Sequence, residues 1–201
     1  MIKLYDHPLS GNCYKVRLLL SHLGIEYDRV KIDIFKGEHK TDLFTKTNPN
    51  QKIPVLDDDG FVLWESNAIL LYLANKHSAN KYLSQDPKKY GLIMQWLIFG
   101  KTSVDPNLAV ARYYKKFLGE GQYRKEDLQK LQAQGGQTLS ILNNHLSNNV
   151  FLAGDYSVAD MACFPYVMLS YEGGMDLSKY EFVNNWIKKV ESEDGFVLIE
   201  Q

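Results

Sequence analysis

Polar side chains gather where the first strand-like segment gives way to the first helix-like segment. Ser10, Asn12 and Cys13 precede a helical stripe made of Val16, Leu19, Leu20 and Leu23. The N-terminus of a helix presents unpaired N–H groups and a partial positive charge, so it attracts anions such as a thiolate. From the residues alone, an alternative stays open, in which Ser10 or Asn12 only caps the helix.

Two further places along the chain carry candidate chemistry. Glu65 and Ser66 stand at the start of another helical stripe, where a serine offers its hydroxyl and its backbone N–H to a carboxylate. An ordinary helix cap would explain Ser66 but not the acid before it, which suits an ammonium group. The second place is the pair Ile53 and Pro54, which opens a short apolar stretch.

The elements that must position these residues alternate between strand and helix patterns up to about residue 76. Ile2 and Leu4 mark a strand, and residues 29–34 alternate strictly between polar and apolar. Residues 53–56 and 61–63 form a hairpin around an acidic turn at 57–60. A helix between the first two strands implies a right-handed parallel crossover. The order predicts a thioredoxin-like α/β domain over residues 1–76, with a mixed four-stranded sheet.

The pattern changes after a polar linker at 77–87. Helical periodicity dominates from Lys88 onward, and Ser157 with Asp160 forms a capping-box signature of the S-x-x-D type. We read that signature as helix nucleation. The second predicted domain is therefore all-helical and spans residues 87–201.

Composition restricts the function classes. The net charge is −1 and the pI is about 6.5, which argues against a nucleic-acid or anionic-membrane partner. No apolar run approaches the roughly 20 residues that span a bilayer, and no secretory signal pattern is present. The two distant cysteines favour a reducing, cytoplasmic location. The five histidines lack metal-site spacing, so we expect no metal.

Five segments give the chain a resemblance to a known family. Residues 10–17, 48–56, 64–69, 105–112 and 154–160 are similar to motifs of the cytosolic glutathione S-transferases, of the serine-type, bacterial-like kind. The similarity spans nearly the whole chain. It implies a glutathione transferase that uses glutathione as co-substrate, needs no other cofactor, accepts a small electrophile and forms a homodimer.

The resemblance gives Ser10 its role, which is to donate a hydrogen bond to the glutathione sulfur. Ionising a thiol of pKa ~8.5 near pH 7 requires a shift of about 2 units, or about 2.7 kcal/mol. A hydrogen bond to a charged group contributes about 1.5–3 kcal/mol and a helix N-terminus about 0.3–2 kcal/mol. The two together suffice without a base. Asn12 is either a second donor or a helix cap.

The resemblance also assigns the other contacts to glutathione. It implies a cis Ile53–Pro54 bond, although only about 5–6% of X–Pro bonds are cis. The Ile53 backbone would pair with the cysteinyl part, as an added strand does. Lys52 would lie near the glycine carboxylate, with Lys36 and His39 as further candidates. Glu65 and Ser66 would bind the γ-glutamyl end. The predicted electrophile pocket between the domains comprises Leu9, Arg112, Tyr113, Tyr114 and Phe117.

Alternatives remain at the same site. Cys13 could serve as the active-site residue in place of Ser10, and Tyr5 as the tyrosine that other classes of the family use, although a buried thiol and a core tyrosine explain them as well. A glutathione-dependent disulfide reductase or peroxidase is the alternative enzyme. A non-catalytic glutathione-transferase-like binding module is the alternative outside enzymology.

Overall fold

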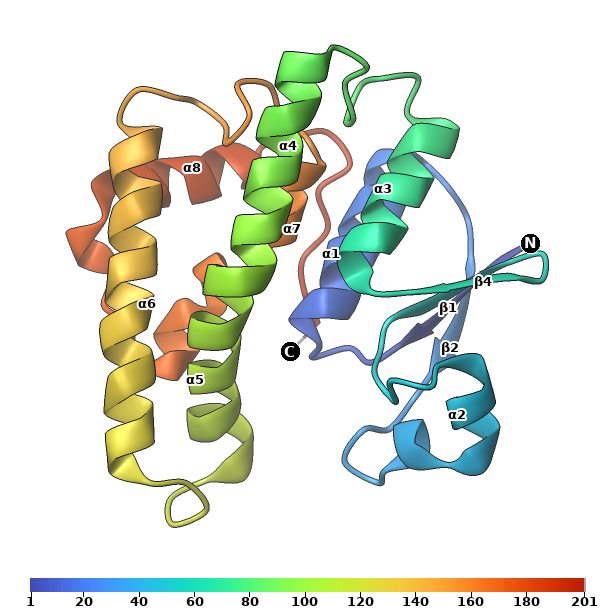
Figure 1. The fold of residues 1–201 in the computed structure, drawn as a ribbon, viewed down its shortest axis with the longest axis horizontal. Helices are drawn as coiled ribbons and strands as arrows, with labels where there is room; N and C mark the ends of the chain where they lie inside the picture. The colour runs from blue at the N-terminus through green and yellow to red at the C-terminus, as the bar shows by residue number, and fades with distance from the viewer. Residues whose placement is uncertain (201) are drawn as a thin grey trace. The chain divides into compact units, whose positions relative to one another are not determined.

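A computed structural model describes residues 1–200 and divides them into two compact units (Figure 1). The N-terminal unit comprises residues 1–83 together with 194–200, and the helical unit comprises residues 84–193. The fold class is as predicted, with a mixed four-stranded sheet in the first unit and helices in the second. The division differs from the predicted spans 1–76 and 87–201 mainly because the end of the chain belongs to the N-terminal unit.

The sheet of the N-terminal unit has the strand order β2-β1-β3-β4. Its strands are β1 (Ile2–Asp6), β2 (Asp28–Lys31), β3 (Val55–Asp58) and β4 (Phe61–Trp64). Strand β1 runs parallel to β2 and antiparallel to β3, and β3 is antiparallel to β4. The parallel pair follows from the crossover helix α1 (Gly11–His22), as the sequence predicts.

Alternation along β1 separates the two faces of the sheet. Leu4 and Asp6 are fully buried, and α1 packs beside α3 (Ser66–His77) in the same unit (Figure 1). Tyr5, between them, meets the ring of Phe44 edge-on at 6.1 Å. Phe44 is the buried residue of α2 (Asp42–Thr47), which follows a short 3₁₀ helix, Glu38–Lys40.

Strand β2 ends at Lys31, three residues before the alternation predicts. The side chain of Asp33 accepts hydrogen bonds from the backbone N–H groups of Phe35 and Lys36 at 3.0 and 3.1 Å. This local turn competes with the sheet ladder and ends the strand. Helix α1 ends before Gly24, which adopts a φ of +63°, and the Ile25 N–H bonds back to the Leu20 carbonyl.

The helical unit begins with α4 (Pro87–Phe99), which continues into a π-helical stretch, Gly100–Ala109, and then α5 (Val110–Tyr113). A second π-helical stretch, Tyr114–Leu118, precedes the long helix α6 (Lys125–Leu146). Helix α7 (Val158–Met168) is buried along almost its whole length. Two 3₁₀ turns, Leu169–Gly173 and Leu177–Lys179, lead to α8 (Glu181–Glu191).

The end of the chain, residues 194–200, packs on the N-terminal unit rather than on the helices that precede it. The Asp194 carbonyl lies 2.7 Å from His22 Nδ1, and the Val197 carbonyl accepts the Tyr14 hydroxyl at 2.6 Å. These bonds attach the tail along α1. The sequence prediction assigned the tail to the helical domain because no local pattern reveals such distant partners.

Residues 1–200 contain neither a candidate membrane span nor a candidate metal cluster. None of the helices described is both long enough and apolar enough to cross a bilayer. In the same part of the chain, no group of three or more histidine, cysteine, aspartate or glutamate side chains is arranged to hold a metal ion.

Candidate active site

Ser10 lies at the junction of the turn after β1 with the first residue of α1. Its φ and ψ of −77° and 118° are extended, and its Oγ accepts the Cys13 backbone N–H at 3.3 Å, so it is the N-cap of α1. The first turn of α1 contains no acidic residue. A hydroxyl can accept one hydrogen bond while it donates its own hydrogen to another atom. Capping the helix and donating to a sulfur are therefore compatible roles.

Asn12 and Ser66 meet although they are far apart in the sequence. The Ser66 hydroxyl donates to Asn12 Oδ1 at 3.2 Å, which joins the start of α1 to the start of α3. Ser66 is 5% exposed and opens α3, so its backbone N–H is one of the unpaired donors of that helix end. The structure thus brings two predicted site residues, one from each helix start, into direct contact.

Glu65 stands immediately before α3 in an unusual backbone conformation. Its φ is +72° and its ψ is 113°, a region that costs a non-glycine residue on the order of 1–3 kcal/mol. Strained residues of this kind gather at ligand sites. The Glu65 carboxylate also accepts Asn50 Nδ2 at 3.1 Å, which fixes its direction. Sequence reasoning did not assign Asn50 a role, although it lies within one of the matching segments.

The Ile53–Pro54 peptide bond is cis, as predicted. Within residues 1–200, neither the N–H nor the carbonyl of Ile53 takes part in a hydrogen bond. The preceding carbonyl, that of Lys52, accepts Asn48 Nδ2 at 2.6 Å, and Asn48 is buried. The loop is therefore held from one side while the Ile53 backbone stays available.

Lys52 and His39 lie on separate segments and make no hydrogen bond to Ser10 or Ser66. Lys52 is exposed, and His39 is half-buried in the 3₁₀ helix. The buried His39 Nδ1 has no hydrogen-bond partner within residues 1–200. Burial, and then the positive charge of Lys40, lower the pKa of His39. The roles of both residues stay predictions.

Cys13 and Tyr5, the two alternatives to Ser10 as the active-site residue, lie in surroundings that do not suit that role. Cys13 is fully buried, and burial followed by the charge of Asp6 raises the pKa of its thiol far above the usual range. A thiol that stays protonated is a poor nucleophile. Tyr5 packs against Phe44, on the other side of β1 from Leu4 and Asp6. Both observations favour Ser10.

The residues predicted to line the electrophile pocket differ in their surroundings. Tyr113 is 47% exposed, and Tyr114 stacks on Tyr123 with ring centroids 5.1 Å apart. Phe117 lies under the Arg112 guanidinium at 5.1 Å. Arg112 itself is 4% exposed and forms an ion pair with Glu172, so it is engaged within the helical unit. Leu9 is half-buried in the turn before Ser10.

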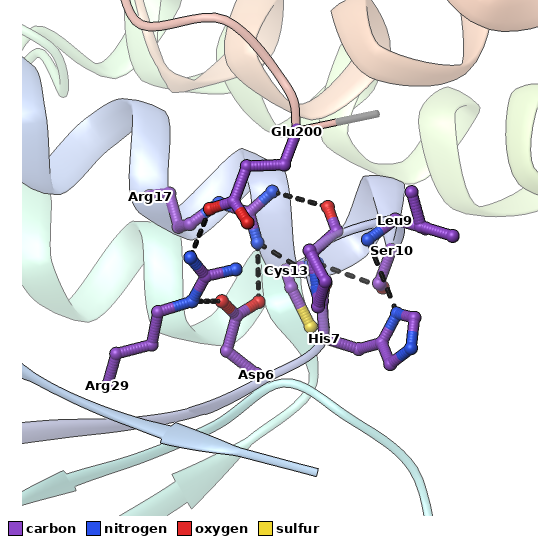
Figure 2. Close-up of polar contacts among 9 residues, drawn as sticks. Asp6, His7, Leu9, Ser10, Cys13, Arg17, Arg29 and Glu200 are labelled. Atoms are coloured by element: carbon purple, nitrogen blue, oxygen red, sulfur yellow. Dashed lines mark hydrogen bonds and ion pairs between the residues drawn. The ribbon is translucent and has the colours of Figure 1, made fainter. Parts of the chain in front are cut away.

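A cluster of charged residues behind Ser10 was missed by sequence reasoning (Figure 2). Arg17 donates to Asp6 Oδ1 at 2.6 Å, and Arg29 Nε donates to the other oxygen of the same carboxylate. Asp6 is fully buried and Arg17 is 6% exposed. Arg17 belongs to the matching segment 10–17, which was the only available signal, since ion-pair partners from separate elements share no sequence spacing.

His7 also belongs to this region and was not predicted. Its Nδ1 accepts the Leu9 N–H at 3.3 Å, and its ring packs edge-on against Phe35 at 5.3 Å. Burial, as the largest cause, lowers the pKa of His7. A neutral ring is consistent with an accepting Nδ1.

This combination defines a class of protein. A thioredoxin-like sheet carries a serine-capped helix N-terminus, and a second helix start with an acid-serine pair touches it. Two family models match the chain, "Glutathione S-transferase, N-terminal domain" over residues 1–75 and "Glutathione S-transferase, C-terminal domain" over residues 91–194.

Individual proteins agree with the family models. The disulfide-bond oxidoreductase YfcG of Escherichia coli strain K12 is 32% identical, with 96% of this chain and 91% of that protein covered. A glutathione S-transferase structure from Pseudomonas fluorescens is 38% identical, with a TM-score of 0.95 over 100% of this chain and 99% of that chain. A glutathione transferase from Pseudomonas putida with bound glutathione disulfide is 27% identical, with a TM-score of 0.88 over 96% and 88% of the chains.

The chain belongs to the glutathione S-transferase family. The predicted family, fold class and enzyme class are therefore confirmed.

Proposed function

We propose that the protein binds glutathione, holds its thiol as a thiolate through Ser10, and directs that thiolate onto a soft electrophile. The observation that carries the proposal is the position of Ser10 at the N-terminus of α1, where its Oγ accepts a helix N–H and its hydroxyl can still donate a hydrogen bond to a sulfur. The N–H bond polarises the hydroxyl, and the helix end favours the anion. Catalysis would come mainly from ionising and positioning the thiol.

The γ-glutamyl end is proposed to bind at the start of α3. The Ser66 hydroxyl and N–H are suited to its carboxylate, and Glu65 is suited to its ammonium group. The contact of Ser66 with Asn12 at 3.2 Å supports a subsite that lies beside the start of α1. The Ile53 backbone would pair with the cysteinyl part, while Lys52 and His39 would approach the glycine carboxylate.

A direct test measures the pKa of the thiol of bound glutathione. Titrating the ultraviolet absorbance of the thiolate in the complex should give a pKa about 2 units below the free value. The protein should also bind immobilised glutathione and conjugate a chloro-nitrobenzene. Binding with an unshifted pKa would contradict thiol activation. If the protein neither binds glutathione nor turns over the chloro-nitrobenzene, the chain acts instead as a non-catalytic glutathione-transferase-like binding module.

The alternative activity, reduction of disulfides with glutathione, is favoured by the similarity to a disulfide-bond oxidoreductase. A neighbouring structure also holds glutathione disulfide. The buried Cys13 is not suited to be the attacking thiol. Cys13→Ala should therefore change turnover of either substrate type by less than about twofold. If Cys13→Ala is inactive while Ser10→Ala retains full activity, the reductase mechanism with Cys13 replaces our proposal.

We also propose that the protein is a cytoplasmic homodimer. The edge strand β4 exposes Phe61, Val62 and Trp64, by 50%, 41% and 37%, on the N-terminal unit. Adjacent exposed apolar side chains are typical of interfaces. Sedimentation equilibrium should give twice the chain mass, and Phe61→Glu should reduce it to the single mass.

A further inference from the structure

The turn that carries Ser10 is held by a single arginine (Figure 2). Arg17 Nη2 donates to the Pro8 carbonyl at 2.8 Å, and Arg17 Nη1 lies 3.3 Å from the His7 carbonyl. The same His7 carbonyl accepts the Ser10 N–H at 3.0 Å. A guanidinium is a rigid planar fork, so it fixes both carbonyls relative to each other. The direction of Ser10 therefore depends on Arg17.

Arg17 is in turn oriented by a buried carboxylate that it shares. Asp6 Oδ1 accepts Arg17 Nη1 at 2.6 Å, and Asp6 Oδ2 accepts Arg29 Nε. Asp6 is fully buried, and the Arg17 side chain is 7% exposed. Charges in such surroundings require close partners, so the two guanidinium groups are divided between the two oxygens of one carboxylate.

The outer end of Arg29 is held by the tail of the chain. Glu200 Oε1 accepts Arg29 Nη1, and this ion pair lowers the pKa of Glu200. The tail lies against α1 at Gly195, where an added Cβ would stand 3.1 Å from the Cα of His22. Gly195 has a φ of +83°, so both its conformation and its lack of a side chain permit this approach. The Tyr14 hydroxyl fixes the tail again at Val197.

We propose that Arg17 and Glu200 are positioning residues for Ser10, which makes the C-terminal tail part of the thiol-activating device. This inference rests on the proposed function. While Glu200 holds Arg29 Nη1, Arg29 meets Asp6 through Nε and leaves Asp6 Oδ1 to Arg17. Without Glu200, the Nη donors of Arg29 compete with Arg17 for the Asp6 carboxylate. Arg17 then loses the partner that orients its guanidinium group.

The test uses Arg17→Lys and Glu200→Gln in the full chain, with the pKa of bound glutathione as the main measurement. Arg17→Lys keeps the positive charge but loses the planar guanidinium group that donates to both carbonyls. It should raise the thiol pKa by about one unit and lower kcat/KM about tenfold, within the roughly 100-fold that misplacing a catalytic group can cost. Glu200 lies at the surface, so Glu200→Gln should fold normally, raise the thiol pKa by about 0.3–0.5 units and lower kcat/KM about two- to threefold.

The sign of the Glu200→Gln effect separates positioning from plain electrostatics. Removing a negative charge favours a nearby thiolate and would lower its pKa, whereas misplacing Ser10 raises it. Asp59→Asn is the matched control, because it removes an exposed carboxylate of the same unit that pairs with the N-terminal amine. It should leave the thiol pKa unchanged.

Coupling between the two residues completes the test. If Glu200 acts through Arg29, Asp6 and Arg17, then Glu200→Gln should add nothing to the thiol pKa once Arg17 is Lys. The inference is overturned if folded Arg17→Lys and Glu200→Gln proteins bind glutathione with the wild-type thiol pKa, or if the two shifts simply add. A wild-type complex that lacks a lowered thiol pKa would instead refute the proposed function.

Discussion

Helices α1 and α7 both begin after a serine that accepts a backbone N–H, but the two helix ends differ in what lies beside the cap. Ser10 accepts Cys13 N–H at 3.3 Å, and Ser157 accepts Ala159 N–H at 3.3 Å. In α7, the Asp160 carboxylate returns to the Ser157 N–H at 3.1 Å and completes a capping box. In α1 the equivalent third position is Cys13, which cannot do so.

The residues around the two helix starts also differ. Asp160 is fully buried and also accepts Leu152 N–H and Trp186 Nε1, both at 2.9 Å. The positive end of α7 is thus neutralised by the protein's own carboxylate. The first turn of α1 has no acid, and Ser10 is only half-buried. The same local cap therefore stabilises the fold in one unit and leaves a place for an external anion in the other.

Asp160→Ala should have the largest effect, because it removes the acid that completes the cap of α7. Leu152 N–H, Ser157 N–H and Trp186 Nε1 would be left as buried donors without acceptors. We expect the free energy of unfolding to fall by about 3–5 kcal/mol, measured by urea unfolding with tryptophan fluorescence. Asp155→Ala is the control, since Asp155 is exposed and its carboxylate pairs with Lys89 at the surface. A loss below about 1 kcal/mol in Asp160→Ala would show that the box is dispensable.

Ser10→Ala tests the cap of α1, which has no acid in its first turn. We expect kcat/KM to fall about 100-fold, or about 2.7 kcal/mol, because the thiolate loses its hydrogen-bond donor. The stability loss should be only about 1 kcal/mol, the usual cost of an N-cap. Ser10→Thr keeps a hydroxyl and should retain most of the activity. If Ser10→Ala lost stability but kept its turnover, Ser10 would be a structural cap like Ser157.

Ser157→Ala is the reciprocal experiment. The free energy of unfolding should fall by about 1–2 kcal/mol, since a buried cap is removed while Asp160 keeps its other donors. The pKa of bound glutathione should stay at the wild-type value, as measured from the thiolate absorbance. A raised thiol pKa in Ser157→Ala would mean that the two helix starts are not independent.

The two caps also show which features could be predicted from the sequence alone. The capping box at 157–160 is a local pattern, so its role could be predicted directly and the structure confirms the box. The order of the four strands and of helices α1 and α3 followed from periodicity for the same reason, whereas α2 (Asp42–Thr47) lies in a polar stretch that was predicted to be a loop. The early end of β2 did not, because the Asp33 turn competes with an alternation that continues to Ile34.

The candidate site could be predicted only in part. Ser10, Asn12, Glu65 and Ser66 lie in segments with recognisable motifs, and the contact between Asn12 and Ser66 unites two of them. The supporting network could not be predicted, because Asp6, Arg17, Arg29 and Glu200 come from four separate segments. The interaction of the tail with α1 is equally non-local, which explains why the predicted domain boundary differed.

The pH dependence of stability distinguishes the cap of α7, which contains an acid, from the cap of α1, which does not. Burial raises the pKa of Asp160 to about 6, although the N–H donors around it act in the opposite direction. Its ordinary value is 3.8, so between about pH 4 and 6 the folded state holds a proton that the unfolded state has released. This contribution therefore stabilises the fold at low pH and is lost as the pH rises through about 6.

Because burial, as the largest cause, also lowers the pKa values of His7 and His39, these histidines contribute to the pH dependence of stability, and wild type must be compared with Asp160→Asn. Both proteins contain these histidines, so their contributions cancel in the difference. The stability of wild type relative to Asp160→Asn should increase by about 1 kcal/mol from pH 7 to pH 5, measured by urea unfolding. A difference independent of pH would mean that Asp160 stays ionised, with its donors outweighing its burial. Ser10→Ala, which removes no acid, should show the wild-type pH dependence of stability.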